Sequence, residues 1–205
     1  MMVSLTDAGK RFNRDWIFRH FTYTFKKGQS YAITGPNGSG KSTLLQVLGG
    51  NILLSEGNGQ WTIDNKKIAN DNIYEHVSIA APYLEVIEEM TLKEFLEFHR
   101  GFKPFLPGID TGKIISVIDL EKAADKQIRH FSSGMKQRTK LAQAIFSDSL
   151  VLLLDEPCTN LDSAGIDLYH RLITDHCRDR LVVVSSNDEV EYRFCQERIN
   201  IVDFK

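Results

Sequence analysis

The sequence lacks an excess of charge of either sign, and it lacks any long hydrophobic run. Its 25 Lys and Arg nearly balance its 27 Asp and Glu, which gives a formal net charge of -2. This balance gives no electrostatic sign of binding to nucleic acid or to an anionic membrane surface. No apolar run approaches the roughly 20 residues that span a bilayer, and the start, MMVSLTDAGK, has no basic-then-apolar leader. We therefore expect no nucleic-acid partner and no direct membrane insertion.

Cysteine is also scarce, and its spacing favours neither a cysteine-rich metal-binding protein nor a disulfide-stabilised one. Cys158, Cys177 and Cys195 show neither paired metal-ligand spacing nor a disulfide framework, so we expect thiols in a reducing, cytoplasmic compartment. The length of 205 residues suits one compact domain with a large core, perhaps with an inserted subdomain. We expect residues 1–205 to form that single domain.

A glycine-rich stretch is the strongest motif that is present. Gly35–Ser42 reads GPNGSGKS and matches the phosphate-binding loop G-x-x-x-x-G-K-[ST], between a strand-like run and a helix-like run. Glycine permits backbone torsions that point successive N–H groups into one concavity, and the helix dipole adds positive potential. Lys41 is expected to bridge the outer phosphates and Ser42 to bind Mg²⁺. The expected nucleotide-binding residues are Gly35, Pro36, Asn37, Gly38, Ser39, Gly40, Lys41, Ser42 and Thr43.

Two carboxylates follow the apolar run Val151–Leu154. Such runs are typical of strands buried on both faces of a parallel sheet, and the carboxyl ends of these strands face the ligand crevice. Asp155 is therefore expected to reach the magnesium ion, and Glu156 to orient or deprotonate the attacking water. Taken alone, the two carboxylates are as well explained by solvation of the strand end. The phosphate loop favours the catalytic interpretation.

The order of apolar patterns predicts an α/β fold. We expect a P-loop NTPase core with an N-terminal antiparallel β subdomain and an inserted α-helical subdomain at about 91–146. The expected strands are Val3–Leu5, Trp16–Phe25, Gln60–Ile63, His76–Ile79, Val151–Leu154, Leu181–Val184 and Ile199–Val202. The expected helices begin near Ser42 and at Thr91, and cover Thr111–Ile118, Gly134–Phe146, Ser163 to about His176, and Glu189–Phe194.

A short segment, Phe131–Met135, completes the pattern. It reads FSSGM and opens a predicted helix before the acidic strand, and by itself Ser132 would be an N-cap. With the phosphate loop and the acidic strand, the chain resembles the ATP-binding cassette (ABC) transporter ATPase family, short single-cassette type, over essentially its whole length. The family's signature loop LSGGQ corresponds to FSSGM, which keeps Ser132 and Gly134. Asn160–Asp162 resembles the loop that touches the partner subunit, and it also suits a helix cap.

The resemblance implies a cytoplasmic ATPase, peripheral to the inner face of the cell membrane, that powers a separate membrane permease. It implies a head-to-tail homodimer or heterodimer that sandwiches two ATP molecules with Mg²⁺. Each site would combine the phosphate loop of one subunit with Ser132 and Gly134 of the other. Phe12 takes the position of the family's aromatic under adenine, with Trp16 as a competitor and core packing as the alternative. The segment Pro82–Thr91 corresponds to the cleft that receives the permease.

Two positions depart from the family pattern. Asn187 stands where the family has a histidine that reaches the γ-phosphate, and an amide is shorter and carries no proton. We therefore predict slow hydrolysis with ATP binding retained. The stretch Ala80–Tyr83 lacks the family's glutamine, and Glu85 or Glu88 are the candidates to replace it. These departures support one alternative, a regulatory subunit with negligible hydrolysis. A non-transport cassette ATPase is disfavoured by the near-neutral charge and the absence of a heptad insertion.

Overall fold

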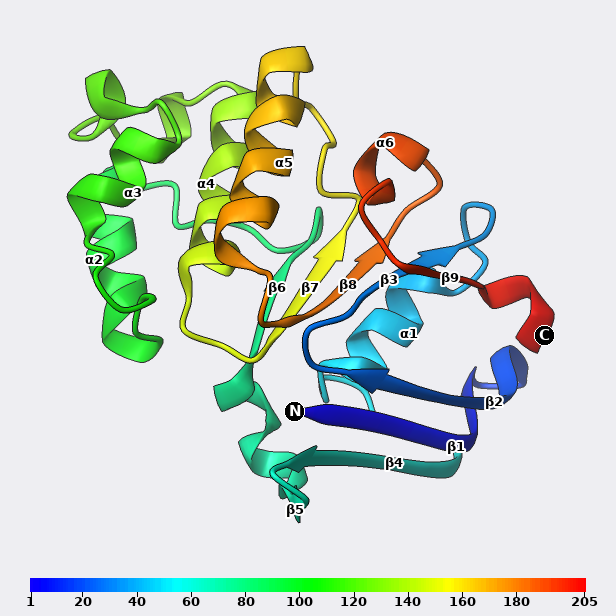
Figure 1. Cartoon of the computed structure of the whole chain (residues 1–205). Helices are drawn as coiled ribbons and strands as arrows, with labels where there is room; N and C mark the ends of the chain where they lie inside the picture. The colour runs from blue at the N-terminus through cyan, green and yellow to red at the C-terminus, as the bar shows by residue number, and fades with distance from the viewer. The chain divides into compact units, whose positions relative to one another are not determined.

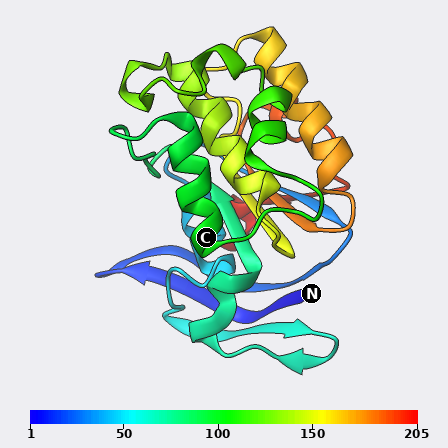
Figure 2. The ribbon, with the colours of Figure 1, turned by 90° about the vertical axis from the view of Figure 1, so that its left-hand side faces the viewer.

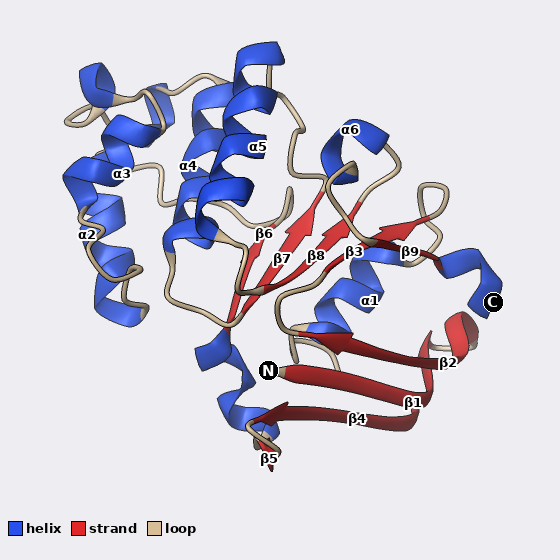
Figure 3. Cartoon of the chain, in the orientation of Figure 1, coloured by secondary structure: helices blue, strands red, loops and turns tan.

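A computed structural model describes all 205 residues as two compact units. The first unit contains Met1–Ile79, Ser149–Glu156 and Asp179–Lys205, and the second contains Ala80–Asp148 and Pro157–Arg178. Figures 1 and 3 show the elements of each unit. None of the helices combines the length and the apolar content that a membrane span requires.

The N-terminal third forms the antiparallel sheet that its aromatic-rich pattern predicts. Strand β1 (Met2–Phe12) pairs with both β2 (Asp15–Lys26) and β4 (Glu56–Ile63), and the short β5 (Lys66–Lys67) continues the order β2-β1-β4-β5. The predicted first strand, Val3–Leu5, is too short. Register shifts after Leu5 break the alternation along β1, so the pattern alone ends the strand early.

A five-stranded sheet forms the other layer of the first unit. Its order is β6-β7-β8-β3-β9, and β8 lies parallel to both β7 and β3. Strands β7 and β8 are buried along their whole length, as their continuous apolar runs predict. Helix α1 (Lys41–Leu48) lies between the two sheets of this unit (Figure 1). The strand bounds are β3 (Ser30–Thr34), β6 (Val77–Ala80), β7 (Val151–Asp155), β8 (Leu181–Ser185) and β9 (Glu197–Asn200).

The core of the first unit joins residues of both sheets and of α1. Phe21 is fully buried in it, and its ring lies 6.0 Å from that of Phe18 and 4.5 Å from that of Phe204, centroid to centroid. Trp61 from β4 donates its indole N–H to the carbonyl of Leu48 at 2.9 Å, which satisfies one of the orphan carbonyls at the end of α1. Trp61 therefore ties the antiparallel sheet to α1, while Phe21 packs against Phe18 and Phe204.

The predicted final strand, Ile199–Val202, is wrong at its second half, Ile201–Val202, which does not belong to a strand. Strand β9 ends at Asn200, and Ile201–Phe204 forms a 3₁₀ turn, η4. The side chain of Asn200 accepts a hydrogen bond from the backbone N–H of Val202 at 3.2 Å and so caps this turn. Ile199 and Ile201 are both buried, so the apolar alternation continues past the point where the strand stops. The other strand and helix bounds near this end agree with prediction to about two residues, with α6 at Glu189–Tyr192.

The second unit is built from helices and loops (Figure 3). Helices α4 and α5 pack side by side, as Figures 1 and 2 both show. The predicted capping box is present, because Thr91 accepts from the N–H of Glu94 at 3.2 Å and returns its own N–H to the Glu94 carboxylate at 2.8 Å. The helix bounds are α2 (Leu92–Phe102), α3 (Thr111–Val117), α4 (Ser133–Phe146) and α5 (Ser163–His176). Short 3₁₀ turns occupy Glu121–Ala123 and Ile128–His130.

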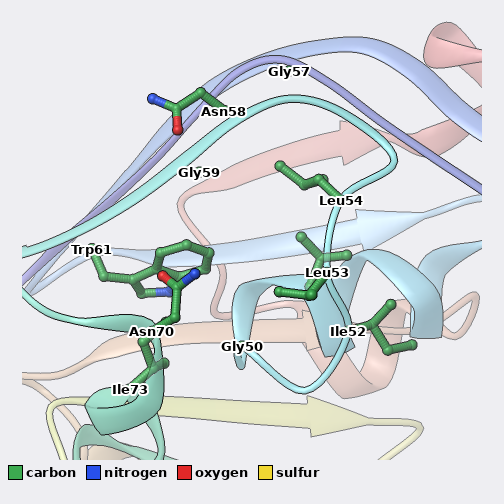
Figure 4. A pocket seen from close by; sticks show the side chains of 11 residues that line it. Gly50, Ile52, Leu53, Leu54, Gly57, Asn58, Gly59, Trp61, Asn70 and Ile73 are labelled. Carbon is green, nitrogen blue, oxygen red and sulfur yellow. The ribbon is translucent and has the colours of Figure 1, made fainter.

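A pocket of about 270 Å³ opens in the first unit near the end of α1 (Figure 4). Trp61 and Ile73 form part of its wall, together with the loop that carries Leu53. The indole N–H of Trp61 is already bonded to Leu48, so the ring offers the pocket an apolar surface. No residue predicted to bind nucleotide lines this pocket, which therefore is separate from the phosphate loop.

Replacing Phe21 with alanine is expected to lower the free energy of unfolding by about 3–5 kcal/mol, because it leaves a cavity among packed rings. Urea denaturation followed by circular dichroism measures the change. Leu53→Ala is the control, since Leu53 is 71% exposed and its truncation should have little effect. Equal effects of the two substitutions would show that Phe21 does not anchor the core.

Candidate functional site

The phosphate loop connects β3 to α1, as its sequence context predicts. Gly40 is the residue before the first turn of α1 and has φ of 105°, a conformation that residues with a side chain rarely adopt. A Cβ atom at this position would lie 2.3 Å from Cγ2 of Ile17 in β2. The glycine therefore allows both the backbone turn and the close approach of β2 to the loop.

Lys41 is folded into the loop that precedes it. Its side chain is only 5% exposed, and Nζ donates to the carbonyl oxygens of Gly35 at 2.8 Å and Pro36 at 3.3 Å. The ammonium group thus holds the loop around itself. A pocket of about 230 Å³ opens at this place. It is lined by Ile17, Glu156 and six residues of the loop and helix start, namely Asn37, Gly38, Gly40, Lys41, Ser42 and Thr43. The pocket lies at the N-terminal end of α1 and contains the cation of Lys41, and both features suit phosphate.

Asp155 ends strand β7 in the same unit as the phosphate loop. It is 3% exposed, and its Oδ1 atom has no hydrogen-bond partner. Ser185 lies opposite in register on β8, and its buried Oγ likewise has none. A buried carboxylate oxygen without a partner is costly, so its environment suits an added cation.

The oxygen donors predicted for the metal ion are of the kind that Mg²⁺ prefers. The ion prefers oxygen ligands, and it is commonly held by one or two carboxylates together with substrate phosphates and water. Asp155 and the hydroxyl of Ser42 are the protein oxygens that the sequence predicts for it. The chain contains no group of three or more His, Cys, Asp or Glu able to hold a metal by themselves.

Glu156 is the first residue beyond β7, and it lines the loop pocket. Its backbone has φ of 44°, which is the left-handed region and is uncommon for a residue with a long side chain. Its N–H donates to the carbonyl of Ser185 at 2.9 Å, so the unusual turn is anchored to β8. Such strain tends to occur at functional positions, where the surrounding structure holds it in place.

Asn187 reaches the phosphate loop from the end of β8. Its Nδ2 donates to Oδ1 of Asn37 at 2.9 Å, and both side chains are exposed. The structure thus brings together the predicted loop, Glu156 and Asn187 within one unit.

Phe12 and Trp16 differ in how much of each ring surface is open to stacking by a ligand. Phe12 is 47% exposed at the end of β1, with Nζ of Lys10 5.0 Å from its ring centroid. Trp16 carries the guanidinium of Arg19 at 4.2 Å from its ring, and that of Arg11 at 5.4 Å. Neither aromatic residue lines the loop pocket.

Ile17 is the neighbour that does line the loop pocket, and sequence reasoning missed it. The only available signal was its position beside Trp16. Close by on the same sheet, Arg19 pairs with Glu56 at 2.7 Å, and this hydrogen bond lowers the pKa of the Glu56 carboxyl. The pair holds the guanidinium over the Trp16 ring, which leaves Phe12 as the more accessible aromatic surface.

The signature residues lie in the second unit. Ser132 is the N-cap of α4 and accepts from the N–H of Met135 at 3.3 Å. A Cβ atom on Gly134 would lie 3.1 Å from the carbonyl oxygen of Asn160, so this turn is closely packed. Asp162 caps α5 by accepting from the N–H of Gly165 at 2.8 Å. The capping roles that the sequence allowed for Ser132 and Asp162 are therefore present.

Glu85 and Glu88 line a pocket of about 210 Å³ within the second unit, beside Lys136 and Lys140 of α4. Glu88 forms an ion pair with Lys136. Lys140 donates to the carbonyl of Pro82 at 3.2 Å, and burial lowers the pKa of its ammonium group. Lysine side chains of α4 therefore connect this helix to the segment Pro82–Glu88, where the expected glutamine is missing.

Comparison with known proteins gives a consistent result. Residues 18–159 match the protein family described as ABC transporter. The chain is 30% identical to the ABC transporter ATP-binding protein YybJ of Bacillus subtilis, over 91% of this chain and 85% of that protein. It is 28% identical to the cytochrome c biogenesis ATP-binding export protein CcmA of Brucella abortus, over 87% of this chain and 81% of that protein.

Solved structures agree on the fold. The dimeric bacterial ABC transporter cassette MJ0796 matches this chain with a TM-score of 0.82 and 22% sequence identity, over 97% of this chain and 94% of that one. The likeness confirms the predicted fold class, a P-loop α/β core with an antiparallel sheet and helices.

Gly40→Ala is expected to abolish ATP binding, because the added Cβ would press on Ile17 and the backbone would be strained. Equilibrium binding of a fluorescent ATP analogue measures the loss, with circular dichroism as the check on folding. Gly101→Ala is the matched control, because a Cβ there meets no atom within 4 Å and the residue lies in α2. Unchanged ATP affinity in Gly40→Ala would contradict the assignment of the loop.

Proposed function

The chain belongs to the ABC transporter family, and we propose that it is the ATP-binding and ATP-hydrolysing subunit that energises transport through a separate membrane permease. The observation that carries this proposal is the site of the first unit, where a loop closed around Lys41 adjoins a pocket that Glu156 also lines. We also propose that residues 1–205 form a single ABC ATPase domain. Its place is the cytoplasmic side of the membrane, in contact with the permease.

Substrate binding follows from the groups around the loop. The backbone N–H groups of the loop Gly35–Thr43, in which Pro36 has none, and the ammonium of Lys41 hold the phosphates of ATP. Ser42 and Asp155 hold Mg²⁺, which neutralises charge on the phosphate oxygens when it is bound. Phe12 stacks on adenine, a role that its 47% exposure supports.

Hydrolysis follows from the carboxylate beside the loop. Glu156 orients a water molecule for attack on the γ-phosphate and accepts its proton. Lys41 and the loop amides stabilise the charge that develops in the transition state. Asn187 takes the place of a histidine at the γ-phosphate, and because it cannot carry a proton we expect a slow enzyme.

A dimer completes the proposed site. Ser132 and Gly134 lie at the start of α4, where backbone N–H groups lack partners within the helix and can bind phosphate. We propose that Ser132 of the partner subunit and Gly134 of the partner subunit close over the ATP bound to the phosphate loop, in a homodimer or a heterodimer. The dimeric state of MJ0796 supports this arrangement. Loss of the γ-phosphate would then release the two subunits.

Glu156→Gln is expected to form a stable dimer in ATP and Mg²⁺, because the amide keeps the shape of the side chain but cannot accept the proton. Hydrolysis should fall by roughly 10²-fold or more. Size-exclusion chromatography and a phosphate-release assay measure the two effects. Glu75→Gln, at an exposed position of the same unit, is the control and should behave as the parent. A purely monomeric Glu156→Gln protein would argue against both the dimer and the base.

Asn187→His is expected to raise ATP turnover severalfold, because imidazole is longer and can carry a proton. Steady-state hydrolysis measured over a range of ATP concentrations separates kcat from KM. Asn58→His tests whether any added histidine has this effect, since Asn58 is exposed on β4 outside the loop pocket. Turnover no higher than that of the parent would remove Asn187 as the cause of slow hydrolysis.

A further inference from the structure

The contact between Asn187 and Asn37 follows from the order of the strands. Strands β3 and β8 are parallel neighbours, with Ile33 opposite Ser185. The chain leaves β3 into the phosphate loop and leaves β8 towards Asn187, so both loops begin at the same edge of the sheet. The two asparagines are 150 positions apart in the sequence, yet the fold places them next to each other.

Both backbones at this contact are held by hydrogen bonds. Ser186 donates its N–H to the carbonyl of Ile33 at 3.1 Å, and Asp188 donates its N–H to Oγ of Ser186 at 2.9 Å. On the other side, Ser39 donates its N–H to the carbonyl of Pro36 at 3.0 Å. These bonds anchor the residues on both sides of Asn187 and the turn of the phosphate loop that contains Asn37.

The direction of the bond determines what Asn37 can offer to a ligand. Asn187 Nδ2 donates and Asn37 Oδ1 accepts, at 2.9 Å. In a planar amide the oxygen and the NH₂ group lie on opposite branches, so binding of Oδ1 leaves the NH₂ of Asn37 as the free branch. Asn37 lines the same pocket as Lys41 and Ser42. Phosphate oxygens only accept hydrogen bonds in this setting, so an NH₂ group attracts them and a carbonyl oxygen repels them.

We propose that Asn187 is a positioning residue that acts through Asn37, and that the amide of Asn37 binds the terminal phosphate of ATP. This inference rests on the proposed function. Glu156 directly follows β7, the neighbour of β8, and lines the same pocket, so we expect the phosphate that is cleaved at this end of the loop. In this pairing the NH₂ group of Asn37 is held in the orientation that an anion requires. ADP lacks the terminal phosphate and gains nothing from the pair.

The test compares the parent with Asn37→Ala, Asn187→Ala and the double variant. Binding of a non-hydrolysable ATP analogue and of ADP is measured by calorimetry, and hydrolysis gives kcat and KM. Each single variant is expected to bind the ATP analogue about threefold to tenfold more weakly, the range of one hydrogen bond, with ADP affinity unchanged. The double variant is expected to match Asn37→Ala alone, because the two residues act as one unit. Asn58→Ala is the control and should resemble the parent.

Asn187→Asp separates a directional effect from simple loss of a contact. A carboxylate only accepts hydrogen bonds, so it would attract the NH₂ of Asn37 and turn the carbonyl towards the phosphate. Binding of the ATP analogue should then be weaker than in Asn187→Ala. The same two substitutions at position 187 are then compared in the Asn37→Ala variant. There the affinities of the Asn187→Asp and Asn187→Ala proteins for the ATP analogue should differ only by the repulsion between the carboxylate and the phosphates.

Two results would overturn the inference while leaving the proposed function intact. Equal weakening of the ATP analogue and ADP would mean that the pair only holds the loop. Additive effects in the double variant would mean that Asn187 acts without Asn37. If the parent bound neither nucleotide, the proposed function would be wrong, and the inference would be wrong with it.

Discussion

The parallel pairing of β8 with β3 on one side and β7 on the other is the constraint on which the site depends. Parallel strands end at the same edge of a sheet, so the loops that follow them are brought together whatever their distance in sequence. The phosphate loop follows β3, Glu156 follows β7 and Asn187 follows β8. Burial of β7 and β8 on both faces fixes the register of these strands, and a slip of one residue would turn Asp155 away from its present position.

Local sequence signals account for most of the fold and for much of the site. The phosphate loop was predictable because glycine spacing and the flanking patterns lie in one short stretch. The caps at Thr91, Ser132 and Asp162 were predictable because a cap involves residues only three positions apart. The buried strands were predictable because continuous apolar runs suit the interior of a parallel sheet.

The features that were missed depend on contacts between distant segments. The approach of Ile17 to Gly40 joins β2 to the loop, and no periodicity in either segment indicates it. The hydrogen bond between Asn187 and Asn37 spans 150 positions, and it requires knowledge of the strand order. The final strand was misplaced because the apolar pattern continues into η4, while the side chain of Asn200 ends the strand. The catalytic and ligand-binding roles of the site residues stay predictions until binding and hydrolysis are measured.

The lysine of the phosphate loop has a consequence for the shape of that loop. Lys41 donates to the carbonyl oxygens of Gly35 and Pro36, and these two bonds use two of the three N–H donors of its ammonium group. If the loop binds ATP as we propose, the third donor can meet a phosphate oxygen while the other two stay with the loop. One side chain would then both shape the binding loop and bind the nucleotide.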